Sequence, residues 1–314
     1  MTNSPILCFG FDRPMHLERM LTSLENNEES KTSTVFICID GPTKDTDLEM
    51  HSKTVKVAEK NWDFHKTNLI IRDKNLTCRT NIIETISEVF KVHDKLIILE
   101  DDLVLGPKFL SYMNNALNIY EDEKNMWCVN GYTYRQLNNK NGASISKYVS
   151  PWGWATWSDR WNIFVNQDYD KKNFISDLSV SERKKFNMEN LYDWENIIVK
   201  NEEGKISAWD AYWYQAIYLN NGFTLYPNKS HVINEGFDGT GMHCSDTNDW
   251  KTPLNSSETK RFPKQIKLSK LFMFNTLNFY RYYQFSRYLR YHKSKFSSFR
   301  NFSNFITKKI GLKS

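Results

Sequence analysis

The segment Lys95-Leu-Ile-Ile-Leu-Glu-Asp-Asp-Leu-Val-Leu105 decides the fold class of this chain. Its apolar run, residues 96–99, is short and continuous, which is typical of a strand buried on both faces of a parallel sheet. Three consecutive carboxylates, Glu100, Asp101 and Asp102, follow at the end of the strand where open α/β sheets bind ligands. Adjacent anions repel each other unless cations or hydrogen-bond donors offset them. The segment therefore predicts a ligand site, and the alternative is a solvated loop whose acids cap the next helix.

The rest of the first 130 residues alternates between short apolar runs and stretches of helical periodicity. This alternation predicts βαβ units around a mostly parallel sheet, and hence an α/β fold. No GxGxxG or GxxxxGKS/T loop is present, so a nucleotide bound here needs another device to hold its phosphates. We expect strands over residues 5–9, 35–40, 69–72 and 96–100, and helices over residues 14–24, 45–60, 80–92 and 107–120.

The middle of the chain is rich in aromatic residues. Seven of the ten tryptophans lie within residues 131–222. They form either a thick aromatic core or, in part, platforms on which the C–H faces of sugars stack. The segment Asn234-Glu-Gly-Phe-Asp-Gly-Thr-Gly-Met-His243 follows, and its three glycines within six residues predict a mobile loop.

The cysteines and the N-terminal sequence indicate the compartment. Five widely spaced cysteines without a CxxC pair are typical of a reducing compartment and argue against a structural zinc site. The first residues contain no basic stretch followed by a long apolar run, so neither a signal peptide nor an N-terminal anchor is expected. The longest uncharged run of the C-terminal region, residues 271–280, is half of the roughly 20 residues that a spanning helix needs. We therefore expect a cytoplasmic protein.

The charge of the chain is unevenly distributed. Residues 259–314 contain 14 Lys and Arg and no Asp or Glu, which leaves 28 basic residues against all 37 acidic ones in residues 1–258. This split argues against a uniformly basic nucleic-acid binder, and no nucleic-acid partner is expected. The tail interleaves basic with aromatic residues, which favours an anionic membrane surface as its partner. Single-stranded nucleic acid, or packing of the tail on the acidic body, stays an alternative.

Six motifs follow one another along the chain: Pro5-Ile-Leu-Cys-Phe-Gly-Phe-Asp-Arg-Pro14, Ile39-Asp-Gly41, Leu99-Glu-Asp-Asp-Leu103, Met126-Trp-Cys-Val-Asn130, Pro151-Trp-Gly-Trp154 and Trp209-Asp210. Their order and spacing resemble those of the GT-A glycosyltransferases, most closely the N-acetylglucosaminyltransferase type I family and its bacterial polysaccharide and lipopolysaccharide glycosyltransferase relatives, over roughly residues 4–245. The resemblance implies a Rossmann-like mixed sheet flanked by helices in residues 1–258, followed by a basic aromatic helical tail, residues 259–314. Residues 1–130 would bind the nucleotide sugar, and residues 131–258 would hold the acceptor and the donor-closing loop.

The resemblance also implies roles for single residues. Asp102 matches the carboxylate that ligates Mn²⁺, or Mg²⁺ in its place, and His243 is a second candidate metal ligand. Asp210 matches the general base, although an aspartate there also suits the N-cap of the following helix. The residues expected to bind the donor are Arg13, Asp40, Glu100, Asp101, Trp154 and Trp209.

The chemistry of sugar transfer fits this set of residues. A nucleoside diphosphate leaves an anomeric carbon readily only if a metal or cationic donors offset its charge, and the acceptor hydroxyl needs a base. We therefore expect an inverting, metal-dependent hexosyl- or N-acetylhexosaminyltransferase. Its donor would be a nucleotide sugar, with UDP favoured, and its acceptor a bacterial surface glycan or lipid-linked oligosaccharide at the inner face of the cell membrane. A nucleotidyltransferase, a metal phosphohydrolase and an inactive glycan- or nucleic-acid-binding module are the alternatives.

Overall fold

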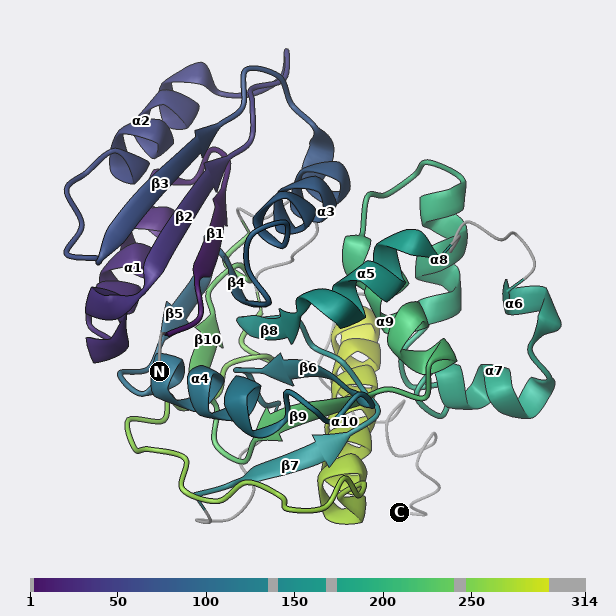
Figure 1. Ribbon diagram of the computed structural model, residues 1–314. Helices are drawn as coiled ribbons and strands as arrows, with labels where there is room; N and C mark the ends of the chain where they lie inside the picture. The colour runs from purple at the N-terminus through teal and green to yellow at the C-terminus, as the bar shows by residue number, and fades with distance from the viewer. Residues whose placement is uncertain (1–2, 135–140, 168–173, 240–246, 294–314) are drawn as a thin grey trace.

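The computed structural model describes residues 3–134, 141–167, 174–239 and 247–293 (Figure 1). The strands are β1 (Ile6–Gly10), β2 (Thr34–Ile39), β3 (Lys66–Ile71), β4 (Lys95–Glu100), β5 (Leu103–Leu105), β6 (Met126–Asn130), β7 (Ala143–Ser146), β8 (Trp154–Trp157), β9 (Phe223–Pro227) and β10 (Val232–Asn234). The helices are α1 (Pro14–Glu25), the 3-10 helix η1 (Glu28–Thr32), α2 (Leu48–Ala58), α3 (Thr77–Val89), α4 (Phe109–Ile119), α5 (Ser158–Asn166), α6 (Phe174–Asp177), α7 (Val180–Phe186), α8 (Trp194–Glu202), α9 (Trp209–Leu219) and α10 (Lys270–Lys293).

Eight strands of the described residues form one mixed sheet in the order β3-β2-β1-β4-β8-β6-β9-β7. Strands β3, β2, β1 and β4 are parallel, whereas β8 runs antiparallel to both β4 and β6, and β7 runs antiparallel to β9. Strands β5 and β10 pair separately. Figure 1 shows α1 and α2 on one side of β1–β3 and α3 on the other, where α3 packs against α5 and α9. The expected α/β class, with a mixed sheet flanked by helices, is confirmed.

The elements expected in the first half of the chain are present, with shifted ends. Strands β1 and β4 are buried along most of their length, as their continuous apolar sequences predict. Helix α2 begins only at Leu48 because the carboxylate of Asp47 accepts hydrogen bonds from backbone N–H groups of its first turn. Helix α3 begins earlier than expected, at Thr77, whose N–H donates to Asn75 Oδ1 over 2.9 Å.

The tryptophans of the middle region form an aromatic core between β8 and the helices α5 and α9. The ring of Trp154 lies 5.2 Å from that of Trp209 and 5.5 Å from that of Trp213, and Trp161 lies 5.5 Å from Trp213, measured between centroids. All four side chains are buried. For these residues the structure favours the aromatic core over exposed sugar platforms.

Helix α10 packs one face on the body and leaves the opposite face in solvent. Phe272 and Tyr280 are buried, and their rings lie 4.8 Å from Tyr226 and 5.3 Å from Tyr134. The guanidinium of Arg290 forms an ion pair with Asp249. The described part of the tail therefore packs on the body, which was one of the alternatives for residues 259–314.

The exposed face of α10 carries apolar side chains between basic ones. Its large exposed side chains recur at helical spacing and are Leu271, Phe274, Tyr282 and Phe285. We call these four residues the α10 ridge. Within the described parts of the chain, no helix combines the length and the apolar character that a membrane span requires.

A buried histidine follows β9 and makes stability depend on pH. The ring of His231 stacks on Tyr112 at 5.1 Å, and its Nε2 lies 2.8 Å from Thr259 Oγ1 and 3.4 Å from Asn255 Nδ2. Because an amide nitrogen only donates, Nε2 accepts the hydrogen bond from Asn255, and the imidazole is neutral. Burial lowers the pKa of His231 to about 4.

We predict that His231 by itself lowers the free energy of unfolding by about 3 kcal/mol as the pH drops from about 6.5 to about 4, a contribution measured as the difference between wild type and His231→Gln. In this window the unfolded chain binds a proton at His231 and the folded chain does not, so stability is retained above the unfolded pKa and lost below it. Urea titrations at pH 7, 5.5 and 4.5 measure the slope. The variant His231→Gln, compared with wild type, should lose this part of the slope. An equal slope in both proteins would contradict the assignment to His231.

Candidate functional site

Two of the three carboxylates at the end of β4, those of Asp101 and Asp102, contact one guanidinium. Asp101 is buried and forms an ion pair with Arg13, whose Nη2 also lies 3.6 Å from Asp102 Oδ2. Arg13 stands between β1 and α1, and β1 pairs with β4 in parallel, so both strands deliver these residues to the same sheet edge. These acids are therefore not the solvated capping groups that the alternative predicted, since α4 has no side-chain cap.

The site has more negative than positive charge. Burial, followed by the charges of Asp102 and Asp210, raises the pKa of Glu100 well above its usual value. Burial also raises the pKa of Asp101 to about 7, although the charge of Arg13 opposes this rise. The pKa of Asp102 is raised in the same way, by burial against the influence of Arg13. One guanidinium does not offset three carboxylates, so a further cation would stabilise their ionised forms.

Arg13 keeps part of its hydrogen-bonding capacity unused. Its Nη1 is buried and has no hydrogen-bond partner among the residues that the structure describes. Burial disfavours the charged form, but the charges of Asp101 and Asp102 outweigh this effect and raise the pKa of Arg13. A buried, permanently charged N–H without an acceptor is costly, and an anionic oxygen of a ligand is the partner that matches it.

Asp40 stands at the end of β2 and joins two loops. Its Oδ1 accepts hydrogen bonds from the backbone N–H groups of Gly41 and Leu76, both over 2.9 Å. The His51 ring donates to the backbone carbonyl of Asp40 over 2.8 Å. This arrangement fixes the rim of the site beside β1, where the contact of Asp40 with a nucleotide base stays a prediction.

Asp210 lies in the first turn of α9, and the N-cap of this helix is Ala208, without a side-chain cap. The N-cap alternative for Asp210 is therefore wrong by position. Its charge acts on Glu100, although 110 positions separate the two residues. Helix α9 brings it to the carboxylates because α9 packs against α3, which begins at the same sheet edge.

A cysteine that the sequence did not single out lies among these acids. Burial raises the pKa of the Cys78 thiol, and so do the charges of Glu100, Asp210, Asp101 and Asp40. One side chain in the first turn of α3 thus senses four of the five acids of the expected site. No local pattern marks Cys78, because its position depends on where α3 begins.

The other expected site residues have different surroundings. Trp154 and Trp209 lie in the aromatic core, stacked on each other and almost completely buried. Their burial favours a packing role, and their contact with a donor stays a prediction. His243 lies outside the described residues, so its role as a metal ligand stays a prediction as well.

The segment after β10 passes directly beside Asp102. The N–H of Glu235 donates to the backbone carbonyl of Asp102 over 2.8 Å. A Cβ atom at Gly236 would overlap the Asp102 carboxylate, so only glycine fits there without displacing it. Two contacts tie the segment to α1: Arg19 Nε lies 3.0 Å from Glu235, and His16 Nε2 lies 3.1 Å from Asp238.

The carboxylates at the end of β4 suit a divalent cation only if phosphate oxygens of a substrate complete its coordination. Within the described ranges, no group of three or more His, Cys, Asp or Glu side chains is arranged to hold a metal ion. Mg²⁺ and similar hard cations, however, often bind one or two carboxylates together with substrate phosphates. Asp102, with the unused nitrogen of Arg13 beside it, suits this second mode.

Comparisons with known proteins give little further information. No family model matches the sequence, and no curated protein matches it. Among solved structures, the chain is similar to S. aureus TarS, known from a crystal structure, with a TM-score of 0.38 and 12% sequence identity. The similarity covers 75% of this chain and 37% of the TarS chain, so the chain spans little more than a third of that relative. A similarity of this degree decides neither activity nor substrate.

Proposed function

We propose that the chain is an inverting, metal-dependent glycosyltransferase that moves a hexosyl or N-acetylhexosaminyl group from a nucleotide sugar to a hydroxyl of a glycan. One observation carries this proposal: Arg13 contacts two carboxylates at the end of β4 and keeps a buried nitrogen without a partner among the described residues. That nitrogen suits an oxygen of a diphosphate. The neighbouring carboxylates suit a cation that the diphosphate shares.

In this proposal the residues at the end of β4 bind the donor. Asp102 would hold Mn²⁺ or Mg²⁺, and the cation would offset charge on the leaving diphosphate. Arg13 donates to the same diphosphate. Glu100 and Asp101 accept hydrogen bonds from hydroxyl groups of the donor sugar and ribose, and Asp40 contacts the base.

Asp210 acts as the general base in this proposal. The acceptor oxygen forms its bond to the anomeric carbon on the face opposite the leaving diphosphate, and the carbon–oxygen bond to the diphosphate breaks. The acceptor hydroxyl gives its proton to the Asp210 carboxylate. The position of Asp210 in the first turn of α9, within the electrostatic reach of Glu100, supports this role.

The test is thermal unfolding of the full chain with a panel of nucleoside diphosphates, each with and without Mn²⁺. We expect one nucleotide, with UDP tested first, to raise the melting temperature only when Mn²⁺ is present. A hundredfold excess over Kd corresponds to about 2.7 kcal/mol of stabilisation. Adenosine monophosphate and Mn²⁺ alone are the controls. If no nucleoside diphosphate stabilises the protein, the donor site is refuted.

We also propose that the acceptor is a bacterial surface glycan or a lipid-linked oligosaccharide, reached at the inner face of the cell membrane. The apolar α10 ridge supports this proposal, because basic residues such as Lys270 and Arg281 flank it. Apolar side chains between cations suit the interface of an anionic bilayer.

Substitutions on the α10 ridge test this proposal better than removal of the tail, which would uncover the core around Phe272 and Tyr280. We predict that the full chain floats with vesicles of phosphatidylglycerol and phosphatidylcholine in equal parts. The triple variant Leu271→Ser, Phe274→Ser, Phe285→Ser should bind more than about tenfold more weakly.

The matched control replaces three exposed apolar residues elsewhere, in Leu48→Ser, Val92→Ser and Val180→Ser, and should float like wild type. Wild-type protein that stays with the soluble fraction, or equal flotation of both triple variants, would contradict membrane binding through α10.

A further inference from the structure

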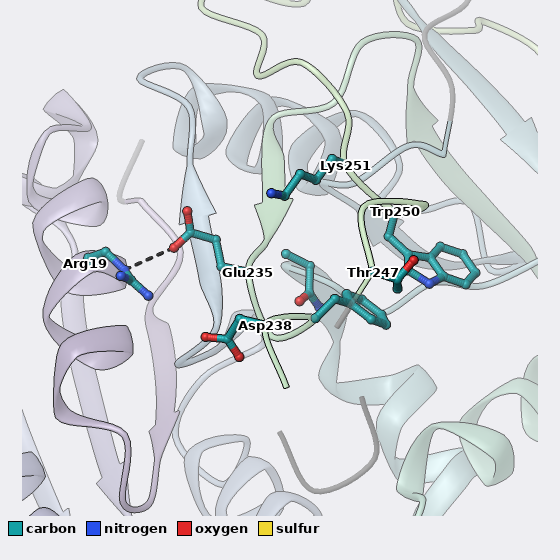
Figure 2. A pocket seen from close by; sticks show the side chains of 8 residues that line it. Arg19, Glu235, Asp238, Thr247, Trp250 and Lys251 are labelled. Carbon is teal, nitrogen blue, oxygen red and sulfur yellow. Dashed lines mark ion pairs between the residues drawn. The ribbon is translucent and has the colours of Figure 1, made fainter. Parts of the chain in front are cut away.

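A pocket of about 240 Å³ lies beside the candidate donor site but contains none of its residues. It is formed by the segment after β10, by residues 247–251 and by Arg19 of α1 (Figure 2). Asn234 of its lining pairs with Leu103 across β10 and β5, and the backbone N–H of the next residue, Glu235, donates to the backbone carbonyl of Asp102. The pocket therefore adjoins the metal-binding residue of the proposed function and opens on a different set of side chains.

The walls of the pocket combine aromatic faces with charges of both signs. The rings of Phe237 and Trp250 stack at 5.6 Å with an interplanar angle of 23°. Carboxylates of Glu235 and Asp238 lie on the other side, and Figure 2 shows the ammonium end of Lys251 directed toward the segment that carries Glu235. A ligand here meets hydrogen-bond donors, hydrogen-bond acceptors and an apolar face at the same time.

The walls are held in place by contacts within the pocket lining and by contacts with neighbouring residues. Arg19 pairs with Glu235, and His16 with Asp238, which fixes the carboxylates relative to α1. The N–H of Thr247 donates to the carbonyl of Phe237 over 3.1 Å. Trp250 also packs on Tyr283 of α10 at 4.7 Å between centroids. Preorganised walls of this kind reduce the entropy cost of binding.

Size and charge select among ligand classes. The volume is below the roughly 300–1,000 Å³ of pockets for drug-sized ligands, so it suits one ring rather than a nucleotide. The charges of Arg19 and Lys251 balance those of Glu235 and Asp238, so the pocket offers no net positive charge to a diphosphate, and its charged rim disfavours an acyl chain. A saccharide ring matches both the polar and the apolar groups of the lining. Its hydroxyl groups would accept a hydrogen bond from Lys251 and donate to Glu235 and Asp238. Its C–H face would pack on the aromatic rings.

We infer that this pocket binds one saccharide ring of the acceptor glycan, away from the hydroxyl that reacts. The acceptor role in this inference rests on the proposed function. The binding of a saccharide in the pocket does not depend on that function. The donor sugar is excluded from the pocket by position, because in the proposed function it lies at Glu100 and Asp101, which do not line it.

The experiment is saturation-transfer NMR on the full chain without nucleotide or metal. The probes are the methyl glycosides of glucose, galactose, mannose, N-acetylglucosamine, N-acetylgalactosamine and glucuronic acid. At least one should receive saturation at its ring protons. The variants Lys251→Met and Glu235→Gln should each weaken its binding about tenfold, since each removes a charge-assisted hydrogen bond.

The controls carry the same substitutions at exposed positions outside the pocket, in Lys264→Met and Glu258→Gln, and should bind like wild type. Binding of none of the glycosides, or equal binding by pocket and control variants, overturns the inference. Displacement of the glycoside by the intact nucleotide sugar would assign the pocket to the donor and overturn the acceptor role. The nucleotide experiment above uses no free sugar, so the proposed function and this inference can fail separately.

Discussion

Asp102→Asn is expected to abolish the Mn²⁺-dependent stabilisation of the protein by its nucleoside diphosphate and to lower turnover about a thousandfold or more. Asparagine keeps the shape of the side chain but removes the charge that holds the cation. A metal ion contributes several kcal/mol to the departure of a charged leaving group, and each 1.36 kcal/mol is a factor of ten in rate. Thermal unfolding with and without Mn²⁺, followed by product formation with the nucleotide sugar, measures both effects.

The matched control for this variant is Asp122→Asn, at an exposed acid beyond α4. It should respond to Mn²⁺ and nucleotide like wild type. The melting temperatures of the two variants without ligand report whether either one is misfolded. A Mn²⁺-dependent shift of normal size in Asp102→Asn would show that the cation is held elsewhere, and the assignment of Asp102 would fail.

Asp210→Asn is expected to lower kcat by about 10²–10⁴, the range typical of a lost general base, with little change in the affinity for the nucleotide. The amide cannot take the proton of the acceptor hydroxyl, whereas the donor contacts at the end of β4 are left intact. Loss of a carboxylate from the first turn of α9 should cost only about 0.3–1 kcal/mol of stability. Steady-state kinetics with varied donor separates kcat from KM.

Cys78→Ser tests whether any change in this cluster would have the same effect. The charges of Asp40, Glu100, Asp101 and Asp210 act on the Cys78 thiol, but Cys78 transfers no proton in the proposed reaction. We expect kcat to stay within a fewfold of wild type. If Asp210→Asn is fully active, Asp210 is not the base; if Cys78→Ser loses as much activity as Asp210→Asn, packing rather than proton transfer explains both.

Much of the fold could be predicted because its signals are local. The apolar run before Glu100 is buried in β4, and the four parallel strands lie within a few residues of their expected ranges. The end of α2 nearest the site differs because a single side chain, Asp47, caps it. Ends of elements depend on individual hydrogen bonds, and periodicity does not encode them.

The site was predictable only in part, because only some of its residues are placed by local sequence signals. Arg13 and the three acids after β4 follow paired parallel strands, and such strand ends meet at one edge. The environment of Trp154 and Trp209 was not predictable, since a tryptophan in a core and one at a sugar site have the same local sequence signal. Their burial follows from how α9 packs on β8 and α5.

The sequence by itself determined the four parallel strands β1–β4, the acidic end of β4 and the basic residue after β1, because each depends on neighbours along the chain. Only the tertiary structure decided which distant groups influence one another: the charge of Asp210 acts on Glu100, four acids act on Cys78, and Glu235 contacts the backbone of Asp102. It also decided that α10 packs one face on the body and exposes the other. These relations depend on packing between elements far apart in sequence, where burial and charge act through space.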